Sequence, residues 1–391
     1  MLEKRGPFNL TRLLYPLDEL RITFTNALLT SSSLEECIYW IAEIHASGWS
    51  PFPLIWEIYY DFYAWKNPSM FDFIVRKQRI YDTTSSCSPV IAVVKNLRVS
   101  EWTFDVFVLR QMVMHNSSPK HIYRGKPTIQ IRNDIHYESL QRSLQRFIMA
   151  WNIGRWEDIT SYLGRMVYEK DTSLTLTTIA DVLFKLNPSV RPNILEGNLG
   201  SLLCYMLTIR FPPETISKPR ILASSIDEEK WYDDTAELTG LTHIERYDLL
   251  SSVTRYSINS DAVSCFYIAR NILQDYVYQW RNYSEYYCKD CPYWNGIMSL
   301  CGASLSIWQS TEPDDLRFMN DDDEEMFYDT NWLHPDEQPT DVVERFIPPI
   351  NNDSHATTWI QNVCDSKGCG VGPISFPTLV WWIESFDKLF V

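Results

Sequence analysis

The sequence lacks any long run of apolar residues. Residues 1–21 contain no continuous apolar stretch of signal-peptide length, and the roughly 18 consecutive apolar residues that would cross a bilayer occur nowhere. We therefore expect a soluble protein that is made in the cytosol and stays there, without membrane insertion. The nine cysteines are an odd number, which favours reduced thiols over a set of disulfides.

Recognised catalytic motifs are also missing. The chain has no G-x-S-x-G elbow, no Walker loop, no G-x-G-x-x-G after a strand and no H-E-x-x-H helix. Asp61 with His45, or Asp134 with His136, would be acid–base pairs, but dispersed surface or core histidines are the favoured interpretation. We predict that the protein is not an enzyme.

Basic residues are too few to balance the acidic ones. Lys and Arg total 35 against 50 Asp and Glu, which gives a net charge of −15 and a pI of about 4.9. Such a molecule repels phosphate backbones and anionic lipid surfaces, so nucleic acid is disfavoured as a direct non-specific ligand. The imbalance is uneven, because residues 1–155 contain 18 basic and 14 acidic residues.

Aromatic residues are abundant, at 14% of the chain, and apolar residues recur at helical spacing through the first hundred positions. Large flat side chains fill cores and make protein interfaces. Leu20, Phe24 and Leu28 share one face of an expected helix. Ser33 stands at the N-cap position of a second helix, and Gly48 stands where a left-handed C-cap would end it.

The helical pattern continues along the chain. Residues 90–97 fit either a buried helix or a strand, and other helices are expected over 54–62, 69–79, 102–114, 137–151 and 262–280. Short connectors between amphipathic helices make neighbours antiparallel, and no fixed repeat period is present. We predict a mainly α fold, an irregular array of antiparallel helical hairpins with a less regular, acidic, aromatic-rich C-terminal region.

Composition and proline-rich joints predict three regions. Residues 1–155 are expected to form the helical-hairpin array, and residues 156–290 a second helical region. Residues 291–391 are expected to form an acidic, cysteine-containing C-terminal region of mixed or irregular structure. The apolar, aromatic end of the chain should dock onto the body or onto a partner.

Acidic residues concentrate in one stretch of the C-terminal region. This acidic strip consists of Asp321, Asp322, Asp323, Glu324 and Glu325. It does not fit an EF-hand calcium loop, because Met326 stands at the sixth position, where the turn needs glycine, and Trp332 at the twelfth, where calcium needs an acid. We interpret the strip as an exposed loop or docking surface.

Basic residues gather in the first region instead. This basic strip consists of Lys120, Arg124, Lys126, Arg132, Arg142 and Arg146. Such a surface is suited to phosphates or to an acidic protein surface, although an ordinary exposed loop and helix face is the commoner explanation. One hypothesis is that it pairs with the acidic strip of the same or a neighbouring molecule.

Two cysteine pairs suggest a metal site. Cys288 and Cys291 are spaced C-x2-C, Cys364 and Cys369 are spaced C-x4-C, and four thiolates of this kind can hold one structural zinc ion. Other residues that would replace one of these ligands are Cys301, His334 and His355. The alternative is that the cysteines are buried or incidental free thiols, and that the protein has no cofactor.

Residues 17–77 resemble a group of uncharacterised α-helical proteins encoded by nucleocytoplasmic large DNA viruses, the giant and algal viruses. The resemblance is carried by Asp18-Glu19-Leu20-Arg21, Ser33-Leu34-Glu35-Glu36 with Tyr39-Trp40, Ser47-Gly48-Trp49, and Trp56-Glu57-Ile58-Tyr59-Tyr60-Asp61-Phe62-Tyr63 before Asn67-Pro68. These are helix caps and aromatic core positions, so no catalytic residue is carried across. The resemblance implies a viral protein in the host cytoplasm, within the viral factory or the virion.

Two functions are expected from these features. The first is a non-enzymatic protein–protein interaction or assembly protein of a large DNA virus, whose partners are other proteins, chiefly viral ones. The alternative is a zinc-stabilised factor associated with viral nucleic acid or the transcription machinery.

Overall fold

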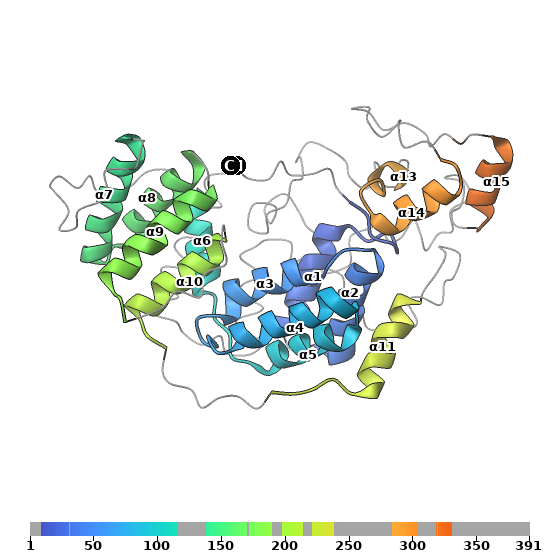
Figure 1. Ribbon diagram of the computed structural model, residues 1–391, viewed down its shortest axis with the longest axis horizontal. Helices are drawn as coiled ribbons and strands as arrows, with labels where there is room; N and C mark the ends of the chain where they lie inside the picture. The colour runs from blue at the N-terminus through green and yellow to red at the C-terminus, as the bar shows by residue number, and fades with distance from the viewer. Residues whose placement is uncertain are drawn as a thin grey trace.

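The computed structural model in Figure 1 describes residues 9–30, 32–115, 138–169, 172–189, 198–213, 221–237, 284–303, 318 and 320–330. Across these ranges the chain is mainly α-helical and contains no β-strand, so the predicted fold class is confirmed. None of the helices within them has the length and apolar character needed to cross a membrane. The expected helix over 262–280 lies outside the described residues.

The helices form three groups along the long axis of the molecule (Figure 1). The central group contains α1 (Leu17–Leu29), α2 (Leu34–Ala46), α3 (Phe52–Ile58), the π-helix η1 (Tyr59–Tyr63), α4 (Met70–Thr84) and α5 (Cys87–Val99). One end contains α6 (Asp105–His115), α7 (Glu138–Ile153), α8 (Trp156–Glu169), α9 (Thr172–Leu186) and α10 (Leu199–Arg210). The periphery of the other end contains α11 (Ile226–Ala236), α13 (Ser284–Tyr287), α14 (Pro292–Leu300) and α15 (Asp321–Thr330).

Local signals fix the ends of several helices as the sequence predicts. The Ser33 hydroxyl accepts a hydrogen bond from the Glu36 amide at 3.0 Å, and Gly48 adopts a φ of +91° after α2. Residues 90–97 lie within α5 rather than in a strand. Pro89 is tolerated in the first turn of α5, because a backbone amide at that position would have no partner within the helix. Burial of the β-branched side chains outweighs their preference for strands.

The main core contains side chains from the central group, from α6 to α10 and from α11. Trp40 is fully buried, and the Tyr15 ring meets it edge to face with the ring centroids 5.2 Å apart. Helices from the first two expected regions therefore share one core. The expected boundaries after residues 155 and 290 stay predictions.

A second core joins the start of the chain to α13, α14 and α15. Leu10 and Leu14, which precede α1, are fully buried there beside Trp294 and Phe327. Residues almost 300 positions apart thus pack together. This second core positions the acidic strip.

Candidate interaction surface

The acidic strip forms the first half of α15, so it is helical where a loop or docking strip was expected. Asn320 caps this helix, since its side-chain oxygen accepts a hydrogen bond from the Asp323 amide at 2.9 Å. The Asn320 amide group in turn donates to the Asp323 carboxylate at 2.8 Å. Acidic residues in a first helical turn also interact favourably with the helix dipole. These local effects stabilise a helix at this position.

Two aromatic residues attach α15 to the molecule. Phe327 is fully buried in the second core, and Tyr328 packs beside it with the ring centroids 5.2 Å apart. The Phe318 ring lies 5.3 Å from that of Phe327. This anchoring through the second half of the helix leaves its acidic first half at the surface.

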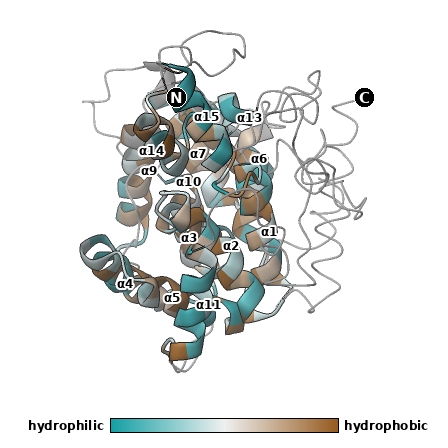
Figure 2. Ribbon diagram, turned by 90° about the vertical axis from the view of Figure 1, so that its right-hand side faces the viewer, coloured by the Kyte–Doolittle hydropathy of each residue, from teal (hydrophilic) through white to brown (hydrophobic). Residues whose placement is uncertain are grey.

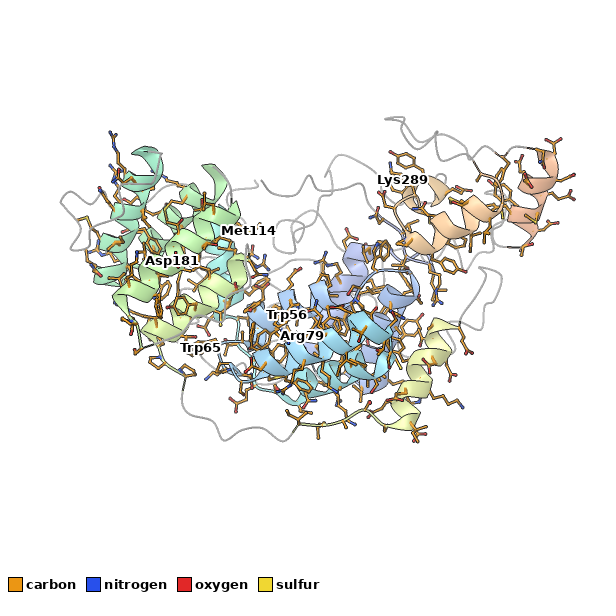
Figure 3. The ribbon with its side chains drawn as sticks, in the orientation of Figure 1. Trp56, Trp65, Arg79, Met114, Asp181 and Lys289 are labelled. Carbon is orange, nitrogen blue, oxygen red and sulfur yellow. The ribbon has the colours of Figure 1, made fainter. Side chains whose placement is uncertain are left out.

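Most carboxylates of the acidic strip face solvent. Asp321, Asp322, Glu324 and Glu325 are exposed, Asp323 is half-buried, and the neighbouring apolar Met326 is 47% exposed. Of the ion pairs formed among the described residues, none includes a carboxylate of α15. Lys289 lies over the Tyr286 ring of α13, 4.0 Å from its centroid (Figure 3). The surface is therefore strongly negative.

Part of this charge does not stabilise the helix. Asp321 and Glu325 are four residues apart, as are Glu325 and Asp329, and like charges at this spacing destabilise a helix by about 0.2–0.5 kcal/mol per pair. The helix dipole stabilises acidic residues in the first turn, but Glu325 and Asp329 lie beyond that turn. Helix stability alone does not account for acids at these two positions, whereas a positively charged partner would.

Only part of the basic strip lies within the described residues. Lys120, Arg124, Lys126 and Arg132 fall outside them, whereas Arg142 is exposed and Arg146 is half-buried on α7. Helices α7 and α15 lie at opposite ends of the molecule (Figure 1). Arg142 and Arg146 thus do not meet the acidic strip of the same molecule, and pairing with a neighbouring molecule stays a prediction.

The first cysteine pair is buried in the second core. Cys288 and Cys291 flank a turn in which the Cys291 amide donates to the Cys288 carbonyl at 2.9 Å, directly before α14. Burial raises the pKa of Cys288 well above its ordinary value and that of Cys291 to about 12. Without a metal ion, both thiols therefore stay protonated and unreactive.

Two of the four proposed zinc ligands lie outside the described residues. Cys364 and Cys369 lie outside the described residues, as do His334 and His355. Cys301 is buried in the same core as the first pair. Among the residues that the structure places, no three His, Cys, Asp or Glu side chains converge to hold a metal ion. The zinc site stays a prediction.

Two buried ion pairs were not foreseen from the sequence. Asp61 in η1 accepts hydrogen bonds from Arg110 of α6 at 2.6–3.0 Å, and His45 bonds to Tyr81 rather than to Asp61. Arg12 pairs with Glu43 at 2.8 Å, and both are buried. The sequence did contain a signal for the first pair, because Asp61 is a charged residue within the aromatic run from Tyr59 to Tyr63. A charged side chain is costly to bury unless it is paired.

No family model, no curated protein and no solved structure matches this chain. The resemblance of residues 17–77 to proteins of large DNA viruses therefore stays a prediction.

Proposed function

We propose that this protein is a non-enzymatic interaction protein whose acidic α15 surface binds a basic surface on a protein partner. The observation that carries the proposal is the unbalanced negative charge on an anchored helix. Phe327 and Tyr328 fix the helix, while the exposed carboxylates repel one another and form no ion pair within the described residues. A partner carrying Lys or Arg would relieve this repulsion on binding.

A protein partner suits this surface better than a metal ion does. Calcium and magnesium need several oxygen ligands that converge on one point. Four carboxylates lie in the first turn of α15, but successive residues of a helix point about 100° apart. No cluster of ligands converges on one point where the structure is described. The exposed Met326 gives the surface an adaptable apolar contact among the charges.

Neutralising the acidic surface tests the proposal. The variant Asp321→Asn/Asp322→Asn/Glu324→Gln/Glu325→Gln keeps the shape of α15 and removes four exposed charges. We expect it to lose partner binding by at least about tenfold in quantitative cross-linking and affinity capture from the cells that produce the protein. Binding of the wild type should also weaken as salt is raised from about 0.1 to 1 M, because the Debye screening length falls from about 10 to 3 Å.

The control removes the same number of exposed charges elsewhere, at Asp72, Asp82, Glu101 and Asp181. Asp181 lies on α9, in the group of helices at the far end from α15 (Figures 1 and 3). We expect the control variant to bind as the wild type does. Equal loss of binding in both variants, or a wild-type protein that is a free monomer at every stage, would contradict the proposal.

The resemblance noted above supplies a proposed context for this interaction. We accordingly propose that the protein acts in the cytoplasm of a host cell, in a viral factory or in the particle, with viral proteins as partners.

A zinc-stabilised factor is the second candidate. The placement of Cys288 and Cys291 on one turn, with Cys301 in the same core, favours it. A structural zinc ion would replace the protons of these thiols and stabilise the second core. Elemental analysis of the purified full chain should then find one zinc ion per molecule, and Cys364→Ser/Cys369→Ser should abolish it. Protein that is folded and free of zinc would exclude this candidate.

A further inference from the structure

The segment before α1, residues 9–16, folds into a tight turn that we name the N-terminal hook. Leu10 pairs with Pro16, the Thr11 amide donates to the Tyr15 carbonyl at 2.8 Å, and the Leu14 amide donates to the Thr11 carbonyl at 2.9 Å. Leu14 has a φ of +60°, a left-handed conformation that a leucine adopts only when its surroundings enforce it. The hook is therefore held by what packs on it.

Arg12 connects the hook to the C-terminal end of α11. Its guanidinium pairs with Glu43 of α2 at 2.8 Å and also donates to the carbonyl oxygens of Thr235, at 2.7 Å, and Ala236. The last carbonyls of a helix have no partner within it, and a cation there also interacts favourably with the helix dipole. A single buried side chain thus joins α2 to the end of α11.

Several other contacts of α11 are polar. Lys95 of α5 pairs with Glu228 at 2.6 Å, and Asn96 of α5 exchanges hydrogen bonds with Leu222 just before the helix. Figure 2 shows α11 mostly in the hydrophilic colour, and of its side chains Tyr232 is the one fully buried aromatic. Trp231 also packs, partly buried, against the main core, so α11 is held by aromatic contacts together with polar ones such as those of Arg12.

The same hook holds α13 and α14. The Leu10 amide donates to the Tyr287 carbonyl at 2.9 Å, and the Trp294 indole donates to the Thr11 carbonyl at 3.3 Å. Leu10 and Leu14 also share the second core with Phe327, the anchor of α15. The hook therefore lies between α11 on one side and the helices that carry the acidic surface on the other.

We infer that the N-terminal hook is a latch that couples the docking of α11 to the docking of α13, α14 and α15. This inference deepens the proposed function, on which it rests for the role of α15 as a binding surface. Release of Arg12 loosens both groups of helices, and a partner that holds α15 in place protects α11, because such coupling is reciprocal. Displacement of residues 9–16 thereby switches the acidic surface between a fixed and a loose state.

Hydrogen exchange of the full chain, measured by mass spectrometry, tests the latch. In Arg12→Met we expect amide exchange to rise at least about tenfold in α11, α14 and α15 together, with α8 and α9 unchanged. The control Arg21→Met breaks the exposed pair of Arg21 with Glu57 and should leave all five helices unchanged. Faster exchange in α11 without α14 and α15, or the reverse, would overturn the coupling.

If Arg12→Met unfolds the whole chain, a milder variant tests the latch instead. Arg12→Lys retains the charge opposite Glu43, but a single ammonium group cannot also reach the carbonyls of Thr235 and Ala236 as the guanidinium fork does. We expect joint loosening of α11, α14 and α15 in this variant. Protection equal to the wild type in α14 and α15, with α11 loosened, refutes the latch.

These measurements use the isolated protein without any partner. If the neutralised α15 variant still binds its partner, the proposed function fails while the exchange result stands. If exchange rises in α11 alone, the latch fails while the binding role of α15 is unaffected.

Discussion

Asp61→Ala is expected to lower the free energy of unfolding by about 3–5 kcal/mol, because it removes the carboxylate that pairs with the buried Arg110 guanidinium. Asp61 is 3% exposed and Arg110 is 2% exposed, so water cannot replace the lost carboxylate. Urea denaturation followed by circular dichroism measures the loss. The control Glu57→Gln breaks the exposed pair with Arg21 and should cost about 0–1 kcal/mol.

Removing both charges separates the cost of an unpaired charge from the value of the pair. Burial raises the pKa of Asp61 although Arg110 acts in the opposite direction, so desolvation outweighs the attraction between the two groups. We therefore expect Asp61→Leu/Arg110→Met to regain most of the stability that Asp61→Ala loses. A double variant as unstable as the single one would show that the pair itself, rather than an unpaired charge, determines stability.

Gly48→Ala is expected to lower the free energy of unfolding by roughly 2–5 kcal/mol and to loosen α14. The left-handed conformation at Gly48 costs a residue with a side chain about 1–2 kcal/mol, and overpacking adds about 1–3 kcal/mol. A Cβ atom on Gly48 would lie 2.6 Å from Cβ of Pro292, the first residue of α14. Denaturation gives the stability, and hydrogen exchange in α14 reports the displacement.

The matched control for this substitution is Gly296→Ala within α14. A Cβ atom there meets nothing within 4 Å, and alanine is favoured over glycine in a helix by about 1 kcal/mol. We expect this variant to be as stable as the wild type or more stable. A Gly48→Ala variant that matched it would show that α14 does not pack against the end of α2 in solution.

The parts of this fold that follow from the sequence are those governed by local chemistry. Helical spacing of apolar residues indicates α1, α2 and α4, and the cap at Ser33 and the left-handed turn at Gly48 depend on immediate neighbours. The π-helix η1 was not predicted. Its Ala64 amide bonds to the Tyr59 carbonyl at 2.7 Å, five residues back, and no local propensity specifies that choice.

The acidic surface and the buried ion pairs likewise depend partly on local sequence and partly on the tertiary structure. The charge of α15 could be seen in the sequence, and its Asn320 cap is a local interaction. Burial of Phe327, in contrast, requires a core assembled from distant segments. The carboxylate partners of Arg12 and Arg110 lie 31 and 49 residues away, so only the tertiary structure brings them together.

The second core also sets an order of events during synthesis. Leu10 is hydrogen-bonded to Tyr287, which leaves the ribosome 277 residues later. At about 5–20 residues per second, this delay is on the order of 14–55 s. During that time Leu10 and Leu14 lack the covering that α13, α14 and α15 supply. The nascent chain therefore presents a partly uncovered apolar N-terminal segment to chaperones until residues 287–328 have emerged.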